Sequence, residues 1–533
     1  MTRGRGFLLF LVLLGVAARC LQYFSRSSLW LDEAALALNL ASRPFRELFT
    51  PLDTAQVAPW GFLAIEKGLF GLFGRNELGL RLLPFFSSLV SLILFERVCR
   101  RILKGLAVPF AVGCFALGTT LISYAGELKQ YSTDVAAAIA ILLLAILVEE
   151  RGLTARRALV LGIAGLLACV FSQPVVFILA GIGLSLVFLA AAGKIEAPAA
   201  ALGLVGALWG LGAGFAVWSG ERMLTPSVKS YLESFWAFGF MPLLSPGAAA
   251  LWPWRQMVRL FAGFLSYPLP FFFLALFVAG AVALSRRKPV AALFLLVPLL
   301  VTLAASAARL YPFAPGRVTA FLIPGVLVLT AEGVERLRTL PSRPLAWIGT
   351  AAAAIAVACP VWAFVTNPPP YMPEHIRPAL ERLRSQRRPG DILYVYYGAH
   401  LGYLFYEPVF DLSALDHVFG QCAREDPRGY LRQLDDFRGR PRVWVLVAHD
   451  LYDERSLIFD YLDRIGRAFE RTDFQFHGSF SPVVLAAYDL TDPDRLSAAT
   501  PEAFPIPVAP AGPPIRLLCH GPMGPLRQSL VPR

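Results

Sequence analysis

Acidic and basic side chains gather at the ends of the long apolar segments of this chain. Asp32 and Glu33 follow the first apolar segment, and Glu127 and Lys129 lie in a tight loop between two later segments. A carboxylate can take a proton from a hydroxyl group, and cations stabilise an anionic group that leaves. Together these side chains favour a site for an anionic lipid substrate at one membrane face. The same set includes Tyr131, Arg309, Tyr311 and Arg317.

Each of these residues, taken alone, also has an ordinary structural interpretation. Asp32 is consistent with a cap at the N-terminus of a helix, where the helix dipole favours a carboxylate. Lys129 and Arg317 are consistent with side chains that reach to lipid headgroups. Their common location at one face is what favours a functional site.

The composition places these residues in a membrane protein. The chain has 533 residues, of which 56% are hydrophobic and 16% are charged, whereas soluble domains carry about 25% charged residues. Residues 158–193 contain no charged side chain, which is long enough for two spans of about 20 residues each. Soluble multidomain enzymes, disordered scaffolds and fibrous repeats are therefore excluded, and we predict an α-helical polytopic membrane protein.

The distribution of positive charge predicts the orientation. With the N-terminus in the cytoplasm, Lys and Arg concentrate in the cytoplasmic segments, while the short outer loops hold only Lys129, Arg309 and Arg317. This asymmetry satisfies the positive-inside rule, so the net charge of +12 gives no reason to expect a nucleic-acid partner. We expect about eleven spans, near 7–24, 80–96, 106–123, 132–148, 158–172, 174–192, 198–218, 261–284, 289–307, 318–333 and 345–365.

The long outer loop near 25–79 is expected to lie in the membrane surface. Residues 30–38 have the apolar spacing of a helix, and this pattern is typical of interfacial helices. A second interfacial helix is expected over residues 60–73, with Glu66 and Lys67 on its polar side.

The composition changes after three consecutive prolines at 368–370. Charged residues become frequent, and strand and helix patterns alternate. We therefore predict a transmembrane domain over 1–366 and a small α/β domain over 371–492 outside the cytoplasm. A Pro-rich tail follows over 500–533.

The histidines and two of the cysteines lie in this last part of the chain. All six His follow the spans, so a His-based metal site among the spans is excluded. Cys422 and Cys519 are the only two cysteines of the outer region, and an oxidising compartment allows a disulfide between them. We predict that pair.

Several short motifs follow one another on the outer side of the predicted topology. Ser28-Leu29-Trp30-Leu31-Asp32-Glu33 resembles the Asp-Glu signature of membrane glycosyltransferases of the GT-C fold. The nearest groups are bacterial relatives of the protein O-mannosyltransferases and the lipid A aminoarabinose and galacturonic acid transferases. The similarity covers about residues 1–400. The other matching motifs are Ala58-Pro59-Trp60, Leu72-Phe73-Gly74 with Arg81-Leu82-Leu83-Pro84, Glu127-Leu128-Lys129-Gln130-Tyr131, and Tyr311-Pro312-Phe313 to Arg317.

One motif departs from the pattern of this family. Members usually carry a basic residue or a His before two prolines, whereas this chain has Gln56 and Val57 before Ala58-Pro59. Gln56 or Lys67 could take over the missing role, and the sequence does not choose between them.

The resemblance implies a sugar donor linked to polyprenyl phosphate, since no nucleotide sugar is available outside the cytoplasm. It implies transfer, with inversion, to a hydroxyl of a lipid, glycan or protein. In that reaction Asp32 would be the general base and Glu33 would orient or assist the acceptor. Glu127 would touch the sugar or an optional divalent ion. The remaining donor-binding candidates are Lys129 and Arg317 for the phosphate, with Arg309, Tyr131, Tyr311, Gln56 and Lys67. The sequence requires no cofactor and leaves a metal undetermined.

Three other functions stay open. A secondary transporter or lipid flippase would need charges near the middle of the bilayer and paired broken helices. An O-antigen-ligase-type enzyme would keep the topology without a reason for the Asp-Glu pair. A catalytically inactive relative that only binds glycan is the third. In each case we expect a multi-pass protein of the bacterial inner membrane, in contact with membrane lipids.

Overall fold

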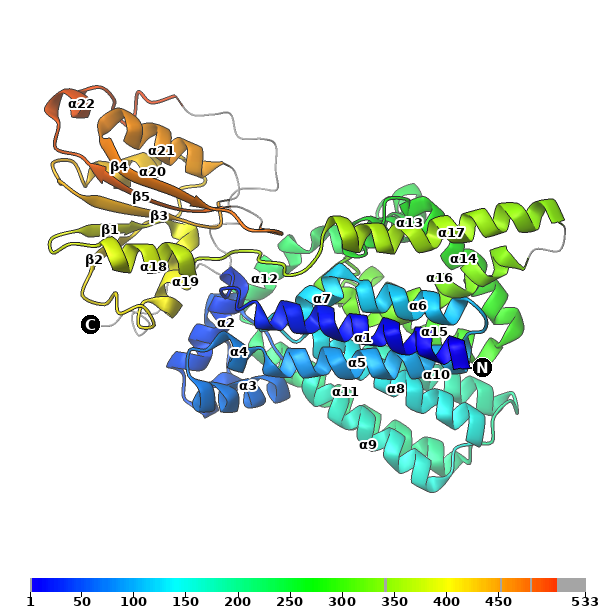
Figure 1. Ribbon diagram of the computed structural model, residues 1–533. Coiled ribbons are helices and arrows are strands. Elements are labelled where there is room, and N and C mark those ends of the chain that lie inside the picture. The colour runs from blue at the N-terminus through cyan, green and yellow to red at the C-terminus, as the bar shows by residue number, and fades with distance from the viewer. Residues whose placement is uncertain (1, 340–342, 451–452, 480–481, 506–533) are drawn as a thin grey trace.

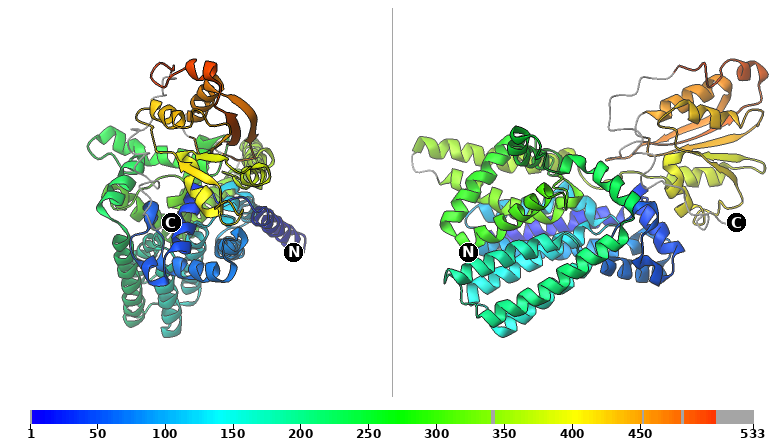
Figure 2. Two further views of the ribbon diagram at one scale, coloured as in Figure 1. Left: turned by 90° about the vertical axis from the view of Figure 1, so that its left-hand side faces the viewer. Right: turned by 180° about the vertical axis from the view of Figure 1, so that it is seen from behind.

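The computed structural model describes residues 2–339, 343–450, 453–479 and 482–505 (Figure 1). A long bundle of helices carries a smaller domain with a β-sheet at one end, and the N-terminus lies at the opposite end (Figures 1 and 2). We call these the domain end and the far end of the bundle. The expected fold class, a helical membrane body with a small C-terminal α/β domain, is confirmed.

The bundle consists of long apolar helices with short helices between them. The long elements are α1 (Thr2–Phe24), α5 (Leu82–Ile102), α6 (Ala107–Leu117), α7 (Thr119–Ala125), α8 (Tyr131–Arg151), α9 (Ala155–Phe171), α10 (Val175–Ala191), α11 (Ala199–Met223), α14 (Pro270–Arg287), α15 (Pro289–Ala307), α16 (Ile323–Arg338) and α17 (Arg343–Thr366). The connecting elements are α2 (Leu31–Ser42), α3 (Trp60–Phe73), α4 (Glu77–Leu80), α12 (Pro226–Phe235), α13 (Pro246–Arg259), and the 3₁₀ helices η1 (Phe45–Phe49), η2 (Asp53–Ala55), η3 (Ala237–Gly239) and η5 (Arg317–Leu322).

The chain is a multi-pass membrane protein. Among the described residues, eight helices are long and apolar enough to cross a membrane, or nine if α6 and α7 form one bent span. The helices α9 and α10 occupy two further predicted segments, but with 17 residues each they are too short to be counted among these eight. The predicted span 261–284 begins too early. A π-helical turn, η4 (Leu260–Phe264), and an irregular stretch precede α14, which begins at Pro270.

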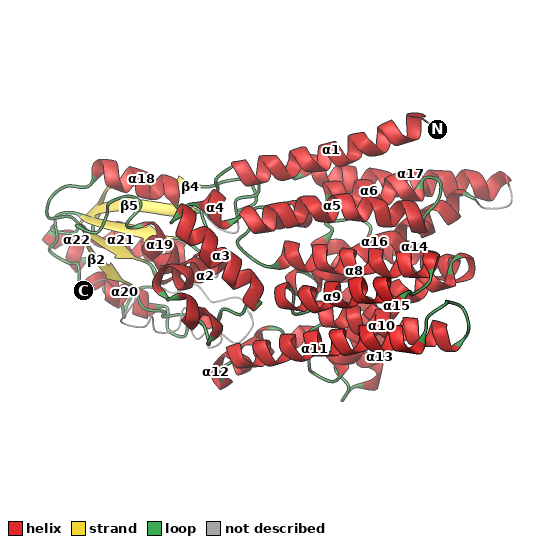
Figure 3. Cartoon of the chain, turned by 90° about the horizontal axis from the view of Figure 1, so that it is seen from below, coloured by secondary structure: helices red, strands yellow, loops and turns green. Residues whose placement is uncertain are grey.

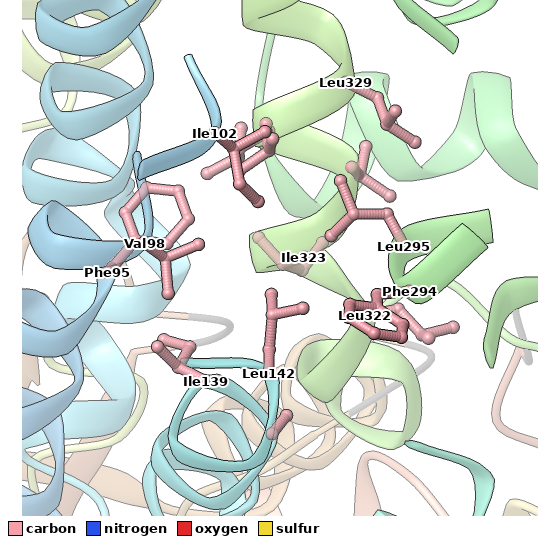
Figure 4. Packing of buried hydrophobic residues seen from close by; sticks show 14 of the residues in the cluster. Phe95, Val98, Ile102, Ile139, Leu142, Phe294, Leu295, Leu322, Ile323 and Leu329 are labelled. Carbon is pink, nitrogen blue, oxygen red and sulfur yellow. The ribbon is translucent and has the colours of Figure 1, made fainter. Parts of the chain in front are cut away.

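Small residues let the helices approach closely. Gly280 of α14 and Gly333 of α16 lie where these helices cross, and a Cβ on Gly280 would collide with the carbonyl of Leu329. Apolar side chains of α5, α8, α15, α16 and η5 fill the interior of the bundle (Figure 4). Close approach of backbones at small residues is the usual way in which membrane helices pack.

A buried arginine stabilises the break between α6 and α7. The two helices bend by 50° at Gly118, which leaves carbonyl groups at the end of α6 without helical partners. Arg19 of α1 donates to the carbonyls of Phe115 and Ala116, at 3.2 and 3.0 Å, and to Ser88 Oγ at 2.8 Å. The break directs α7 toward the loop that carries Glu127 and Lys129.

The C-terminal domain is built on a mixed sheet with the strand order β2-β1-β3-β5-β4. The strand β1 is parallel to β2 and β3, whereas β5 is antiparallel to β3 and β4. The elements are α18 (Arg377–Gln386), β1 (Ile392–Val395), η6 (Tyr397–Ala399), α19 (His400–Tyr406), β2 (Asp416–Phe419), α20 (Arg428–Asp435), β3 (Val443–Val447), α21 (Glu454–Ile465), β4 (Arg467–Phe474), β5 (Val483–Asp489) and α22 (Pro493–Ser497). Of the predicted tail, residues 506–533 lie outside the described part.

The domain is joined to the bundle by a common hydrophobic core. Leu36 of α2 and Leu63 of α3 belong to the same buried cluster as Leu380 of α18, Leu404 of α19 and Leu446 of β3. The helices α2, α3 and α4 lie between the spans and the domain (Figure 3), whereas α20 and α21 cover the opposite face of the sheet. A shared core of this kind holds the domain in a fixed position on the domain end.

Candidate active site

Asp32 lies in the first turn of α2, directly after the chain leaves α1. The helix begins after Trp30, which is its N-cap, so Asp32 does not serve as the cap itself. Asp32 is only 9% exposed, although it stands at the domain end of a membrane body. A buried carboxylate in this place needs a partner.

That partner is Arg317, at the start of η5. Its guanidinium forms an ion pair with the carboxylate of Asp32. The other side of the guanidinium lies against the rings of Phe235 and Trp236, at 5.9 and 5.5 Å from their centres. The hydroxyl of Tyr311 donates to the carbonyl of Val318 at 2.8 Å, which holds the loop in shape. Tyr311 therefore positions Arg317 through the backbone.

The loop between α7 and α8 brings a second cation and a second carboxylate to the same place. Lys129 donates to Gln56 Oε1 at 2.5 Å, and Glu127 accepts from the indole Nε1 of Trp30 at 3.3 Å. Tyr131 begins α8 and lies beside Arg317. The structure thus brings Gln56, and not Lys67, to the cation of the Glu-x-Lys motif.

Glu33 pairs with Arg81 rather than with Arg317 or Lys129. Its two carboxylate oxygens accept from Nε and Nη2 of Arg81 at 2.8 and 2.6 Å, and both side chains are almost fully buried. The same carboxylate accepts from the backbone N–H of Leu128 at 2.6 Å, while Arg81 also donates to the carbonyls of Ser27 and Ser28. The pair ties the Asp32 loop to the Glu127–Lys129 loop, and the assistance of Glu33 in catalysis stays a prediction.

Burial and charge act in opposite directions on the site residues. Burial tends to raise the pKa of Asp32, but the charges of Arg317 and Lys129 outweigh it and lower the pKa to about 2. Burial and the charge of Glu33 raise the pKa of Glu127 to about 8, against Arg317 and Lys129. Burial, supported by the charge of Arg317, lowers the pKa of Lys129. At neutral pH, Asp32 is therefore ionised and Glu127 is mostly protonated.

Two predicted donor residues lie elsewhere. Lys67 donates to the carbonyls of Leu40 and Arg43, at 2.5 and 2.7 Å, so its ammonium satisfies the C-terminal end of α2. Arg309 stacks on the ring of Phe240 at 5.1 Å and does not join the cluster around Asp32. The expected polar position of Glu66 is wrong: the side chain is fully buried, burial raises its pKa well above the usual range, and its carboxylate oxygens have no hydrogen-bond partner within the described structure.

Trp30 and His449 are neighbours of the cluster that the sequence did not single out. The ring of His449, from the C-terminal domain, stacks on the ring of Trp30 at 6.5 Å, with 30° between the planes. The available signal was its position directly after a buried strand, where the ends of parallel strands form binding sites.

The described residues contain no cluster that could hold a metal ion, and they include one of the two cysteines of the predicted disulfide. Within the described ranges, no three His, Cys, Asp or Glu side chains lie together in a way that could hold a metal ion. Cys422 is disulfide-bonded, but Cys519 lies outside the described residues, so the pairing of these two stays a prediction.

Comparison with solved structures identifies the fold. The apo crystal structure of the oligosaccharyltransferase from Archaeoglobus fulgidus matches 83% of this chain and 69% of its own, with 13% identity and a TM-score of 0.50. The chain has the GT-C fold. ArnT from Cupriavidus metallidurans in the apo state is a further GT-C structure that matches 91% of this chain and 98% of its own, with 12% identity and a TM-score of 0.47. No protein-family profile matches the sequence, and no curated protein does.

Proposed function

We propose that this GT-C chain is a membrane glycosyltransferase that moves a sugar from a polyprenyl-phosphate-linked donor to a hydroxyl group. The observation that carries the proposal is the cluster of Asp32, Arg317 and Lys129 at the domain end of the bundle. A polyprenyl phosphate has an apolar tail for the spans and an anionic head for these cations. The acceptor is a lipid, a glycan or a protein.

The proposed reaction is a single displacement with inversion. The acceptor oxygen forms a bond to the anomeric carbon of the sugar, and its proton passes to a carboxylate oxygen of Asp32. The bond between this carbon and the phosphate oxygen breaks, and the electron pair leaves with the phosphate. The products are a glycoside and polyprenyl phosphate, whose charge Arg317 and Lys129 stabilise.

The ion pair of Asp32 with Arg317 implies an order of events. A carboxylate with a pKa near 2 is a weak base. A donor phosphate that takes over the guanidinium of Arg317 removes the largest influence that lowers this pKa, and the basicity of Asp32 then rises. The donor therefore activates the base, which favours loading of the donor before the acceptor.

The proposed location is the bacterial inner membrane, with the N-terminus in the cytoplasm and the C-terminal domain outside. The positive charges of the sequence support this orientation. A reporter enzyme that is active only outside the cytoplasm, fused to the C-terminus, should be active. Activity of a cytoplasmic reporter at the same position would reverse the topology.

The function is tested with the purified full-length chain. It should bind undecaprenyl phosphate, which is the donor without its sugar. It should also release undecaprenyl phosphate from a panel of undecaprenyl-phosphate-linked sugars when membranes from cells that lack the chain are added. Absence of binding would exclude the proposal. Binding without release from any donor of the panel would favour the inactive, glycan-binding alternative, and transport of the intact donor between leaflets would favour a flippase.

A further inference from the structure

The carboxyl ends of β1 and β3 form an edge of the C-terminal domain that faces the candidate active site. The chain runs from β1 to β2 on one side and returns to β3 on the other side, so a topological switch point lies between β1 and β3. In parallel sheets, ligands bind outside the carboxyl ends of the strands at such a point. Tyr397 and His449 follow these two strand ends, and Gly398 is so close to β3 that a Cβ would meet the carbonyl of Ala448.

Several contacts fix the C-terminal domain against the loop that carries Asp32. Ser28 Oγ lies 2.9 Å from Nδ1 of His375, and the N–H of Leu29 donates to the hydroxyl of Tyr406 at 2.8 Å. Trp30 then links the two parts, because its indole N–H reaches Glu127 while its ring stacks on His449. The switch point and the Asp32 cluster are therefore two sides of one region.

His449 is held in a specific orientation there. Its Nδ1 lies 3.2 Å from Oε2 of Glu374, whose side chain is buried. The backbone of His449 has a φ of 57°, a left-handed conformation that residues other than glycine adopt with strain. Such residues persist where the surrounding structure enforces them, and they concentrate at functional sites. Trp30, on which the imidazole stacks, stands two residues before Asp32 in the chain.

We propose that His449, oriented by Glu374, binds the acceptor hydroxyl group beside Asp32, so that the C-terminal domain forms the acceptor side of the active site. This inference rests on the proposed glycosyltransferase function. The imidazole Nε2 hydrogen-bonds to the acceptor oxygen, while Asp32 takes the proton of that oxygen. Trp30 separates His449 from the Glu127 loop, so the donor phosphate and the acceptor approach Asp32 from different sides.

The test measures how the chain divides its donor between acceptor and water. Undecaprenyl phosphate carrying a radiolabelled hexose is incubated with the full-length chain and with membranes from cells that lack the chain. The label transferred to the membranes and the free hexose are measured in the same sample. His449→Ala should lower the ratio of transferred to free hexose at least tenfold, because water replaces an acceptor that is no longer held. Binding of undecaprenyl phosphate should stay within twofold of the unmodified chain.

Three further variants make the result specific. His449→Gln keeps a hydrogen-bonding end and should recover part of the ratio, while Glu374→Gln should lower it by less than His449→Ala. His417→Ala is the matched control, because His417 lies on the edge strand β2 and contacts the carbonyl of Leu415 at 3.0 Å. An unchanged ratio in His449→Ala would refute the proposal, as would parallel loss of transfer and of undecaprenyl phosphate binding. An unmodified chain that binds no undecaprenyl phosphate would instead refute the proposed function.

Discussion

Arg317 donates a hydrogen bond to the carboxylate of Asp32, although 285 residues separate the two in the chain. The pair joins the loop after the first span to the start of η5, at the domain end of the bundle. Each side chain is engaged by the other. In the proposed reaction, the donor phosphate and the carboxylate of Asp32 therefore compete for the same guanidinium, and this competition makes the assignment of Asp32 testable by binding as well as by turnover.

Replacement of Asp32 should have opposite effects on turnover and on donor binding. Asp32→Asn removes the basicity, and positioned proton transfer contributes about 10²–10⁴ in rate, so turnover should fall on that scale. Undecaprenyl phosphate should bind about 10- to 150-fold more tightly, since Arg317 loses a charged competitor worth roughly 1.5–3 kcal/mol. Asp53→Asn is the control, because Asp53 pairs with Arg43 at 2.9 Å in the same loop. Near-normal turnover in Asp32→Asn would return Asp32 to a structural role.

Loss of either cation should weaken binding of the lipid phosphate. Arg317→Ala and Lys129→Ala should each reduce the affinity for undecaprenyl phosphate about 10- to 150-fold, which corresponds to roughly 1.5–3 kcal/mol for a charge-assisted hydrogen bond. Arg309→Ala should not change the affinity, because Arg309 stacks on Phe240 instead. Equal losses in all three variants would indicate a general effect of positive charge at the membrane surface rather than a built site.

Replacement of Glu33 should lower the free energy of unfolding, because Glu33 is the counter-charge of the buried Arg81. Glu33→Gln leaves the buried guanidinium of Arg81 without its counter-charge, and such a change costs roughly 3–5 kcal/mol. Thermal unfolding of the detergent-solubilised chain should show this loss. The double variant Glu33→Leu/Arg81→Leu should unfold at a higher temperature than Glu33→Gln, since no buried charge remains unpaired. A stable Glu33→Gln chain without turnover would support the catalytic assignment of Glu33.

Binding of undecaprenyl phosphate should weaken as the pH rises through about 8. The pKa of Glu127 is raised to about 8 by burial and by the charge of Glu33, so the carboxyl is neutral below that pH and negative above it. A negative charge beside the phosphate site opposes the bound anion. Titration of affinity between pH 6 and about pH 9 should show the decrease, and Glu127→Gln should remove it. A decrease that persists in this variant would point to Lys129, whose pKa is lowered by burial.

Local features of the sequence were sufficient to predict the membrane body and the α/β class of the C-terminal domain. Uncharged blocks of about 20 residues predict spans, because apolar periodicity and backbone hydrogen bonding in a helix are local. The same locality explains why strand and helix patterns could be recognised after residue 370. The prediction of a span failed at 261–284, because the composition stays apolar there although the backbone leaves the helix at Ser266, a residue with a φ of 57°.

The sequence predicted which residue types lie at the candidate site, and the structure showed which of these residues contact one another. The sequence placed Asp32, Glu127, Lys129 and Arg317 on one face, because the loops between spans must return there. The sequence could not show which cation each carboxylate of the Asp-Glu pair meets. Adjacent residues of a helix point in different directions, and their partners depend on packing. In the structure, Asp32 meets Arg317 and Glu33 meets Arg81.

Charge, apolar spacing and motif order by themselves determined that this is a helical membrane protein, and they predicted an anionic-lipid site at one face. Only the tertiary structure decided that Gln56 rather than Lys67 reaches Lys129, and that His449 of the C-terminal domain lies against Trp30. The physical reason is that spans and strands form from interactions within a few residues. The partners of a buried charge come from segments hundreds of residues apart, and their meeting depends on how the whole core packs.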